Sequence, residues 1–150
     1  MMSIFKRIVV GTDGSDTAAE AVRQAAEIAR MSGAELEVVC AAEPIPAWRS
    51  DAKRSAAPDD VSYEFGQRED ANFAIEAAAR IANEVGVEIR PHPMEGDPAD
   101  AILDVAENSK ADLIVVGNKG MTGAKRYLLG SVPNKVSHHA PCSVFIARTT

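Results

Sequence analysis

The run Ile8-Val9-Val10-Gly11 is continuously apolar and stops at a glycine, and Leu113-Ile114-Val115-Val116-Gly117 shows the same pattern late in the chain. Continuously apolar strands are typical of a parallel sheet that is covered by helices on both faces. Other short apolar runs alternate with stretches of helical periodicity along the chain. The sequence therefore predicts a single α/β domain over residues 1–150, built as a doubly wound five-stranded parallel sheet with helices on both faces.

The expected elements alternate between strand and helix throughout. The strands cover 8–10, 36–41, 87–94, 113–116 and 143–147. The helices cover about 17–31, 67–85, 98–109 and 132–140. Thr17 and Glu20 have the spacing of a capping box, and Asp97-Pro98 is a typical helix start. Residues 43–66 show no regular period, so we expect a surface excursion there.

Composition favours a cytoplasmic protein that binds neither nucleic acid nor membrane. Lys and Arg total 16 against 22 Asp and Glu, which gives a net charge of −6 that repels both kinds of polyanion. No apolar run approaches the ~20 residues of a membrane helix, and the N-terminus runs into a strand without a signal-peptide pattern. Cys40 and Cys142 lie in apolar runs and are expected to be small buried hydrophobes.

Two glycine-bearing loops are expected at the edge of the sheet where ligands bind. In open α/β sheets the ligand crevice lies beyond the carboxyl ends of the strands. Gly11-Thr12-Asp13-Gly14-Ser15 follows the first strand. The segment 117–123 follows the fourth strand and continues to Gly130-Ser131, where a helix begins. Both loops are therefore expected at the ligand-binding edge of the sheet.

The second loop has the parts of an anion-binding cradle. Glycines let backbone N–H groups approach phosphate oxygens, and the helix start at 130–132 adds free N–H groups and a favourable dipole. Lys119, Lys125 and Arg126 make the segment locally cationic. The alternative is that the glycines only permit turns. The P-loop pattern and the dinucleotide fingerprint are both absent.

The spacing Gly117-x2-Gly120-x9-Gly130-Ser131 resembles the nucleotide motif of the ATP-binding branch of the universal stress protein family. The segments 9–15, 96–98 and 139–144 are also similar to that family. The resemblance covers about residues 4–148, apart from the excursion between the second strand and the second helix. It implies the strand order 3-2-1-4-5 and ATP as the ligand, with Mg²⁺.

The resemblance also implies which residues hold the nucleotide. Asp13 should face the ribose or the adenine, Ala41 should offer backbone groups to the adenine edge, and Gly117 should lie under the ribose. The phosphates should be held by 118–123 and 130–132. The full set expected to bind the cofactor is Gly11, Thr12, Asp13, Ala41, Gly117, Asn118, Lys119, Gly120, Met121, Thr122, Gly123, Gly130, Ser131 and Val132.

Other chemically capable residues do not form a catalytic or metal-binding set. His138 and His139 are adjacent and diverge on a helix, so we expect one to be packed and one solvated. His92 lies between two prolines and is expected at the surface. No Cys/His spacing indicates zinc, and Ser131 does not lie in a Gly-x-Ser-x-Gly elbow. For Asp13 a turn or capping role is the alternative to nucleotide contact.

The favoured function is a nucleotide-sensing stress-response regulator, in which bound ATP stabilises a conformation that an unidentified protein partner reads. A dedicated base for phosphoryl transfer is not evident, so a slow ATPase or phosphate-transfer enzyme is the second hypothesis. The third is a binder of another adenine nucleotide, AMP or cyclic AMP.

A homodimer is expected through the fifth strand. Pro91 and Pro93 cannot donate to a ladder, so they place the third strand at one sheet edge and protect it. In the implied order, 143–147 forms the other edge, with neither proline nor charge, and such an edge invites pairing. The alternative is a monomer whose edge is covered by the 43–66 segment.

Overall fold

The five strands form one parallel sheet in the order β3-β2-β1-β4-β5. The computed structural model describes residues 3–42, 59–118 and 130–149. Within them the strands are β1 (Arg7–Gly11), β2 (Glu35–Ala42), β3 (Ile89–Glu95), β4 (Leu113–Gly117) and β5 (Ser143–Ala147). The predicted fold class and strand order are confirmed. The connections that leave β1 and β4 diverge to opposite faces, so these neighbouring strands form the switch point.

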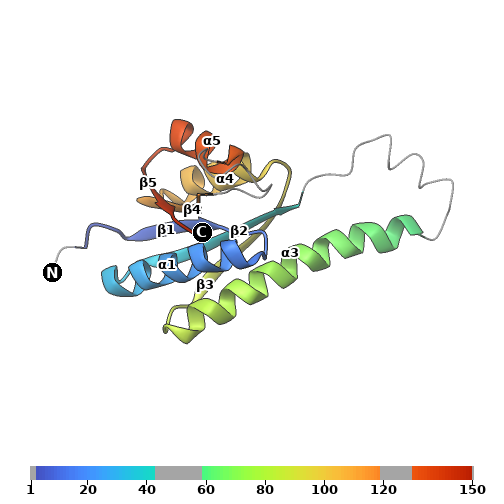
Figure 1. Ribbon diagram of the computed structural model, residues 1–150, viewed down its shortest axis with the longest axis horizontal. Coiled ribbons are helices and arrows are strands. Elements are labelled where there is room, and N and C mark those ends of the chain that lie inside the picture. The colour runs from blue at the N-terminus through green and yellow to red at the C-terminus, as the bar shows by residue number, and fades with distance from the viewer. Residues whose placement is uncertain (1–2, 43–58, 119–129, 150) are drawn as a thin grey trace.

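Four helices cover the two faces of the sheet in pairs. They are α1 (Asp16–Ser32), α3 (Asp59–Glu84), α4 (Pro98–Ser109) and α5 (Ser131–His139). Figure 1 shows α4 and α5 on one side of the sheet and α1 and α3 on the other. None of the helices in the described ranges is long and apolar enough to cross a membrane.

The alternation of side chains along β1 joins the two halves of the core. Ile8 and Val10 pack with α1 and α3, whereas Val9 packs with α4 and α5, and all three are 0% exposed. Alanines such as Ala21 and Ala25 line the buried face of α1, which lets that helix approach the sheet closely. The continuously apolar strand thus serves two cores, as predicted.

The N-terminal cap of α4 is the one predicted from the sequence, whereas the cap of α1 is not. Asp97 caps α4 by accepting a hydrogen bond from the Asp100 N–H, and Pro98 occupies the first turn, as expected. The cap of α1 is Ser15, whose Oγ accepts from the Ala18 N–H at 3.2 Å. The predicted capping box of Thr17 and Glu20 is therefore wrong. Its physical reason is that Glu20 is engaged by two side chains one turn further along the helix, Arg23 and Gln24.

The long helix α3 begins earlier than the sequence suggested. It starts at Asp59, whereas the expected start was about residue 67 and residues 59–66 were expected to be irregular. The helix runs through Gly66, because one glycine costs a helix only ~1 kcal/mol. Pro58 precedes the helix and two aspartates open it, which is a favourable start. The rest of the expected excursion, 43–58, lies outside the described residues.

Strand β3 is an edge strand, as its prolines predicted. It begins at Ile89 rather than at residue 87. His92 on this strand is half-buried rather than fully at the surface, because its Nε2 lies 3.3 Å from Oε1 of the buried Glu37 on β2. A second polar contact joins the same two strands, because Arg90 Nη2 on β3 donates to Glu35 Oε1 on β2 at 3.0 Å.

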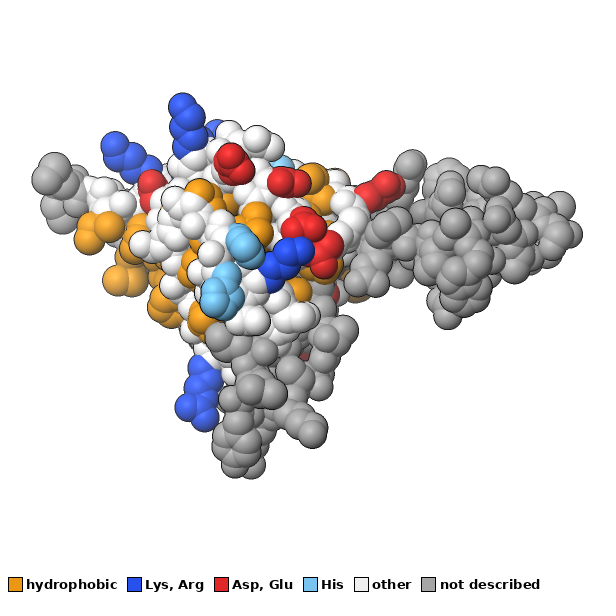
Figure 2. Space-filling view, turned by 90° about the horizontal axis from the view of Figure 1, so that it is seen from above, with side chains coloured by type: hydrophobic (Ala, Val, Ile, Leu, Met, Phe, Trp, Pro, Cys, Tyr) orange, Lys and Arg blue, Asp and Glu red, His pale blue; other side chains and the backbone are white. Residues whose placement is uncertain are grey.

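The outer surface of α4 and α5 is polar, and Figure 2 views the molecule from this side. Lys135 on α5 pairs with Asp97 and Asp100 at the start of α4, at 3.3 Å and 2.8 Å. His138 and His139 are both exposed. The expectation that one of them is packed is therefore wrong, because Val136 already supplies the buried contact of that turn.

Candidate functional site

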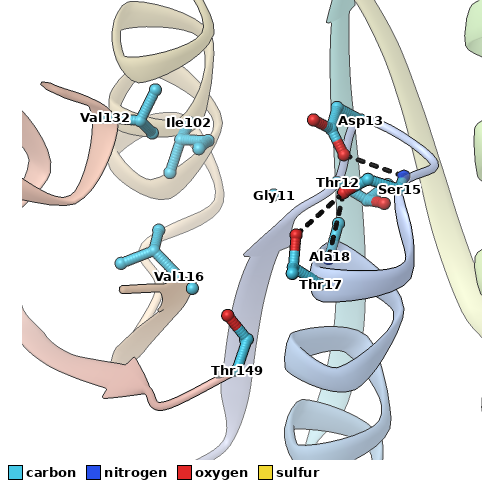
Figure 3. A pocket seen from close by; sticks show the side chains of 11 residues that line it. Gly11, Thr12, Asp13, Ser15, Thr17, Ala18, Ile102, Val116, Val132 and Thr149 are labelled. Atoms are coloured by element: carbon cyan, nitrogen blue, oxygen red, sulfur yellow. Dashed lines mark hydrogen bonds between the residues drawn. The ribbon is translucent and has the colours of Figure 1, made fainter. Parts of the chain in front are cut away.

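A pocket opens at the carboxyl edge of the sheet between β1 and β4, at the switch point. It encloses about 410 Å³, part of it open to solvent. Figure 3 shows the described residues that line it, which come from five parts of the chain. They are Gly11, Thr12, Asp13, Ser15, Thr17, Ala18, Ile102, Val116, Gly117, Val132 and Thr149.

One wall of the pocket is the turn from β1 to α1. The Thr12 N–H donates to the Val39 carbonyl on β2 at 2.9 Å, so the turn is anchored to the sheet. The Gly14 N–H donates to Thr12 Oγ1 at 3.1 Å, and the Ser15 N–H donates to Asp13 Oδ1 at 2.9 Å. These bonds hold the turn in a fixed shape. The exposed Asp13 carboxylate keeps its second oxygen available toward solvent or a ligand.

The opposite wall contains the start of α5. The N-cap residue, Gly130, carries no side chain with which to cap the helix. The N–H groups of Ser131 and Val132 lie in the first helical turn and have no acceptor inside the helix, while Pro133 has no N–H. The N-terminus of α1, by contrast, is capped by Ser15. Of the two helix starts beside the pocket, the start of α5 is therefore the one suited to an anion.

The floor and the remaining wall are largely apolar. Ile102 from α4 and Val116 from β4 are buried, and Val132 from α5 is 8% exposed. Gly11 lets Ile102 pack closely against the end of β1, because a methyl group at Gly11 would lie 2.5 Å from Ile102 Cδ1. Such a surface suits a flat apolar ring, while the polar groups stand at the rim.

Charge in the described part of the pocket is unevenly placed. Asp13 is the only ionisable side chain among the described residues that line it.

Cys40 near the end of β2 is buried, and burial raises the pKa of its thiol, with the negative charge of Asp13 adding to the shift. The thiol is therefore held protonated. Cys142 is only half-buried, so the expectation of two buried cysteines holds for Cys40 alone.

The pocket brings together part of the predicted nucleotide-binding set. Five of the predicted residues line it: Gly11, Thr12, Asp13, Gly117 and Val132. Gly130, Ser131 and Asn118 lie next to it in the chain without lining it. Ala41 is half-buried against the α4–α5 core and does not line the described pocket. Lys119, Gly120, Met121, Thr122 and Gly123 lie outside the described residues.

Six lining residues were not in the predicted set: Ser15, Thr17, Ala18, Ile102, Val116 and Thr149. Four of them lie in or directly beside the predicted glycine loops, and two do not. Ile102 lies in the middle of α4 and Thr149 follows β5, both far in sequence from the glycine loops. Neither belongs to a motif, and only the packing of α4 and the path of the chain after β5 bring them to the pocket. The signal available in the sequence was the buried face of α4, which predicts that Ile102 is buried but not what it faces.

The model of the universal stress protein family matches residues 4–148. The chain belongs to the universal stress protein family. Universal stress protein Rv1636 of Mycobacterium tuberculosis is 39% identical over 150 residues, covering 99% of this chain and 100% of the relative. The family assignment from the glycine spacing is thereby confirmed.

Two solved members of the family carry adenine nucleotides. A crystal structure of a universal stress protein in complex with cyclic AMP has a TM-score of 0.72 and 32% identity, covering 99% of this chain and 100% of that one. The universal stress protein of Archaeoglobus fulgidus in complex with dAMP has a TM-score of 0.66 and 28% identity, covering 95% and 98% of the two chains. The fold of this family is thus shared along the whole chain.

Proposed function

We propose that this universal stress protein binds an adenine nucleotide, with ATP as the expected ligand, and works as a nucleotide-sensing regulator. The observation that carries the proposal is the contrast between the two sides of the pocket. One side presents the Asp13 carboxylate in front of a capped helix, and the other presents the start of α5, whose N-cap residue, Gly130, has no side chain with which to cap it. The complexes of related proteins with cyclic AMP and dAMP support the choice of an adenine nucleotide.

This contrast orients the ligand. Phosphate groups are favoured at the N–H groups of Ser131 and Val132 and disfavoured beside Asp13. A carboxylate can instead accept hydrogen bonds from sugar hydroxyl groups. The apolar surface of Ile102 and Val116 between the two sides suits the flat nucleoside. The roles expected for Ala41 and for residues 119–123 remain predictions.

The described residues also fit a metal ion that arrives with the nucleotide. No group of three or more His, Cys, Asp or Glu side chains in the described ranges could hold a metal by itself. Mg²⁺ in nucleotide sites is commonly bound by one or two carboxylates together with phosphate oxygens and water. Asp13 could supply one carboxylate oxygen to such an ion, whose positive charge would offset the repulsion between this carboxylate and the phosphates.

A regulatory role is favoured over an enzymatic one. Rapid phosphoryl transfer uses a positioned base or water-orienting group, metal ions and often an arginine. The described lining supplies one ionisable side chain, Asp13. Binding energy would then be used to favour one conformation that a protein partner recognises. A homodimer joined through β5 in the cytoplasm remains our expectation.

Calorimetric titration of the protein with ATP, AMP and cyclic AMP tests the proposal, with GTP as the comparison ligand. Replacing Ser131 with Asp adds a negative charge at the first turn of α5, where it should favour the helix but repel phosphate. We expect at least tenfold weaker ATP binding, and a smaller loss for AMP. Ser137→Asp makes the same change at an exposed position later in α5 and should leave the affinity within twofold.

The results of these titrations distinguish three questions: where the phosphates bind, which adenine nucleotide is preferred, and whether any is bound. Equal loss of affinity in the two aspartate variants would contradict a phosphate site at the start of α5. Tighter binding of AMP or cyclic AMP than of ATP would favour the alternative ligands. Failure of every adenine nucleotide to bind would overturn the proposed function.

A further inference from the structure

Asn118 is hydrogen-bonded to two later segments of the chain, the start of α5 and the residues at and after the end of β5. Its backbone N–H donates to the Ala147 carbonyl at 2.9 Å, and its carbonyl accepts from the Gly130 N–H at 3.2 Å. Its side-chain Oδ1 accepts from both the N–H and the Oγ1 of Thr149, each at 2.9 Å. We call Asn118, Gly130, Ala147 and Thr149 the Asn118 junction.

Of the partners in the Asn118 junction, Thr149 lines the pocket, and Gly130 lies two residues before the lining residue Val132. Gly130 is the N-cap of α5. Ala147 is the last residue of β5 and is fully buried. Thr149 lines the pocket beside Gly117, and a Cβ added at Gly117 would lie 3.4 Å from Thr149 Cγ2. The junction therefore fixes the start of α5 and the pocket wall at Thr149 relative to the end of β4.

The side chain of Asn118 is well suited to this task. An amide oxygen has two lone pairs, and here both are used by donors of one residue, Thr149. The oxygen that could have contacted a ligand is thereby engaged within the protein. Only the amide Nδ2 is left as a side-chain group for direct contact with a nucleotide.

We propose that Asn118 is a positioning residue for the nucleotide site, which acts by holding Thr149 and the start of α5 in place rather than through its oxygen on the ligand. The inference rests on the proposed function, because the affected quantity is nucleotide affinity. The same contacts connect the edge strand β5 to the pocket, because Ala147 is the last residue of β5 and Thr149, two residues later, lines the pocket. A substitution at Asn118 removes the side-chain bonds to Thr149 and leaves the backbone bonds to Ala147 and Gly130 in place, so it acts first on the pocket wall at Thr149.

Variants of similar size separate positioning from general stability. Asn118→Leu keeps the shape and removes the acceptor, whereas Asn118→Asp keeps an oxygen for both Thr149 donors. Thr149→Val removes the Oγ1 donor and keeps the methyl group beside Gly117. Asn108→Leu, at an exposed position near the end of α4, is the matched control.

The affinities for ATP and for uncharged adenosine are measured by calorimetry, at a temperature where urea titration shows each variant folded. We expect Asn118→Leu to bind both ligands at least fivefold more weakly and Asn108→Leu to bind them within twofold of the unmodified protein. Asn118→Asp should restore adenosine binding to within about threefold, while its extra charge disfavours ATP. Combined with Asn118→Leu, Thr149→Val should cause no further loss, because both changes break the same contact.

Amide hydrogen exchange without nucleotide gives an independent measurement. The Thr149 amide should exchange at least tenfold faster in Asn118→Leu and be restored in Asn118→Asp. If the unmodified protein binds no adenine ligand, the proposed function fails, while faster exchange at Thr149 would still support the positioning role. Unchanged exchange at Thr149 in Asn118→Leu would overturn the inference, as would ATP affinity within twofold of the unmodified protein or additive losses in the double variant. Should Asn118→Leu not fold, Thr149→Val alone decides: it must weaken adenosine binding at least twofold.

Discussion

Gly11 at the end of β1 leaves the space that Ile102 of α4 fills: a Cβ at residue 11 would lie 2.5 Å from Ile102 Cδ1 and 3.1 Å from its Cγ1. Ile102 is 1% exposed, so its side chain has little room to move aside. The close approach seats α4 on the sheet directly beneath the pocket. The glycine is thus required by packing at this position, independently of any ligand.

Gly11→Ala should lower the free energy of unfolding by about 1–3 kcal/mol, because the added methyl overpacks the core. Urea titration measures the change. Ile102→Val removes the nearest carbon and should recover part of the loss when combined with Gly11→Ala, giving a non-additive pair. Gly117→Ala at the end of β4 is the control, since its Cβ would meet Thr149 at an ordinary 3.4 Å. Equal stability of the two alanine variants would contradict the packing argument.

Asp97 at the start of α4 predicts an acid-dependent contribution to stability. The hydrogen bond from the Asp100 N–H, followed by the contact with Lys135, lowers the pKa of Asp97 below its usual 3.8. Because the pKa of Asp97 is lowered in the folded protein, the ionised carboxylate stabilises the fold fully at pH values above its usual pKa. This contribution to stability is lost as the pH falls through the lowered pKa. Asp97→Asn should therefore cost about 0.3–1 kcal/mol at pH 7 and nothing in strong acid.

Chemical unfolding of both proteins between pH 7 and about pH 2.5 measures this difference. Asparagine can still cap the helix, so the comparison isolates the charge from the hydrogen bond. Asp104→Asn, an exposed aspartate further along α4, serves as the control. A difference that grows toward acid would show that the sign of the argument is wrong.

Strand β5 predicts the oligomeric state. It forms a sheet edge, Phe145 and Ile146 on it are 40% and 37% exposed, and Figure 2 shows hydrophobic side chains gathered on the side of the molecule where β5 lies in Figure 1. We expect a dimer that pairs through this edge. Phe145→Lys with Ile146→Lys should convert it to a folded monomer. Val144 is a poorer choice, because it packs against the core.

Light scattering at tens of micromolar protein decides the oligomeric state. Phe73→Lys on α3 is the control, because Phe73 is more exposed, at 65%, and lies on a different element. Its replacement should leave the dimer intact. A monomeric unmodified protein would contradict the pairing through β5, as would a dimer that survives both lysines.

Turnover of Mg-ATP should be a small fraction of typical enzyme rates, which are ~1–10³ s⁻¹. The reason is that the sequence shows no dedicated base for phosphoryl transfer. A phosphate-release assay on the purified protein makes the measurement, with Asp13→Ala and Asp16→Ala as paired variants. Robust hydrolysis that Asp13→Ala abolishes and Asp16→Ala preserves would favour the slow-enzyme hypothesis.

The sheet was predictable because its signals are local and agree with one another. The apolar runs of β1 and β4, the prolines of β3 and the Asp97-Pro98 start of α4 each carry their own physical reason. The errors arose where two local signals compete. Ser15 and Thr17 both offer a hydroxyl two residues apart, and the tertiary path of the turn selects Ser15 as the cap.

The site was predictable only where a loop motif carries it. Gly11, Thr12 and Asp13 follow a strand end and could be placed at the crevice from the order of elements alone. Ile102 and Thr149 reach the same pocket through packing and chain path, and nothing in their neighbours in the sequence marks them. Lining residues that lie on a helix face or after the end of a strand could be identified only from the three-dimensional structure.

The position of Thr149 on the pocket wall has a practical consequence for labelling the protein. A purification tag or fluorophore joined after residue 150 would begin beside the pocket, where it could obstruct a ligand or report its arrival through a change in emission. The segment before β1 lies at the opposite end of that strand from Gly11, and there Ser3 Oγ donates to the Ser32 carbonyl at the end of α1. Tags for binding studies should therefore be placed before β1, and a dye close to Thr149 should be kept for use as a sensor.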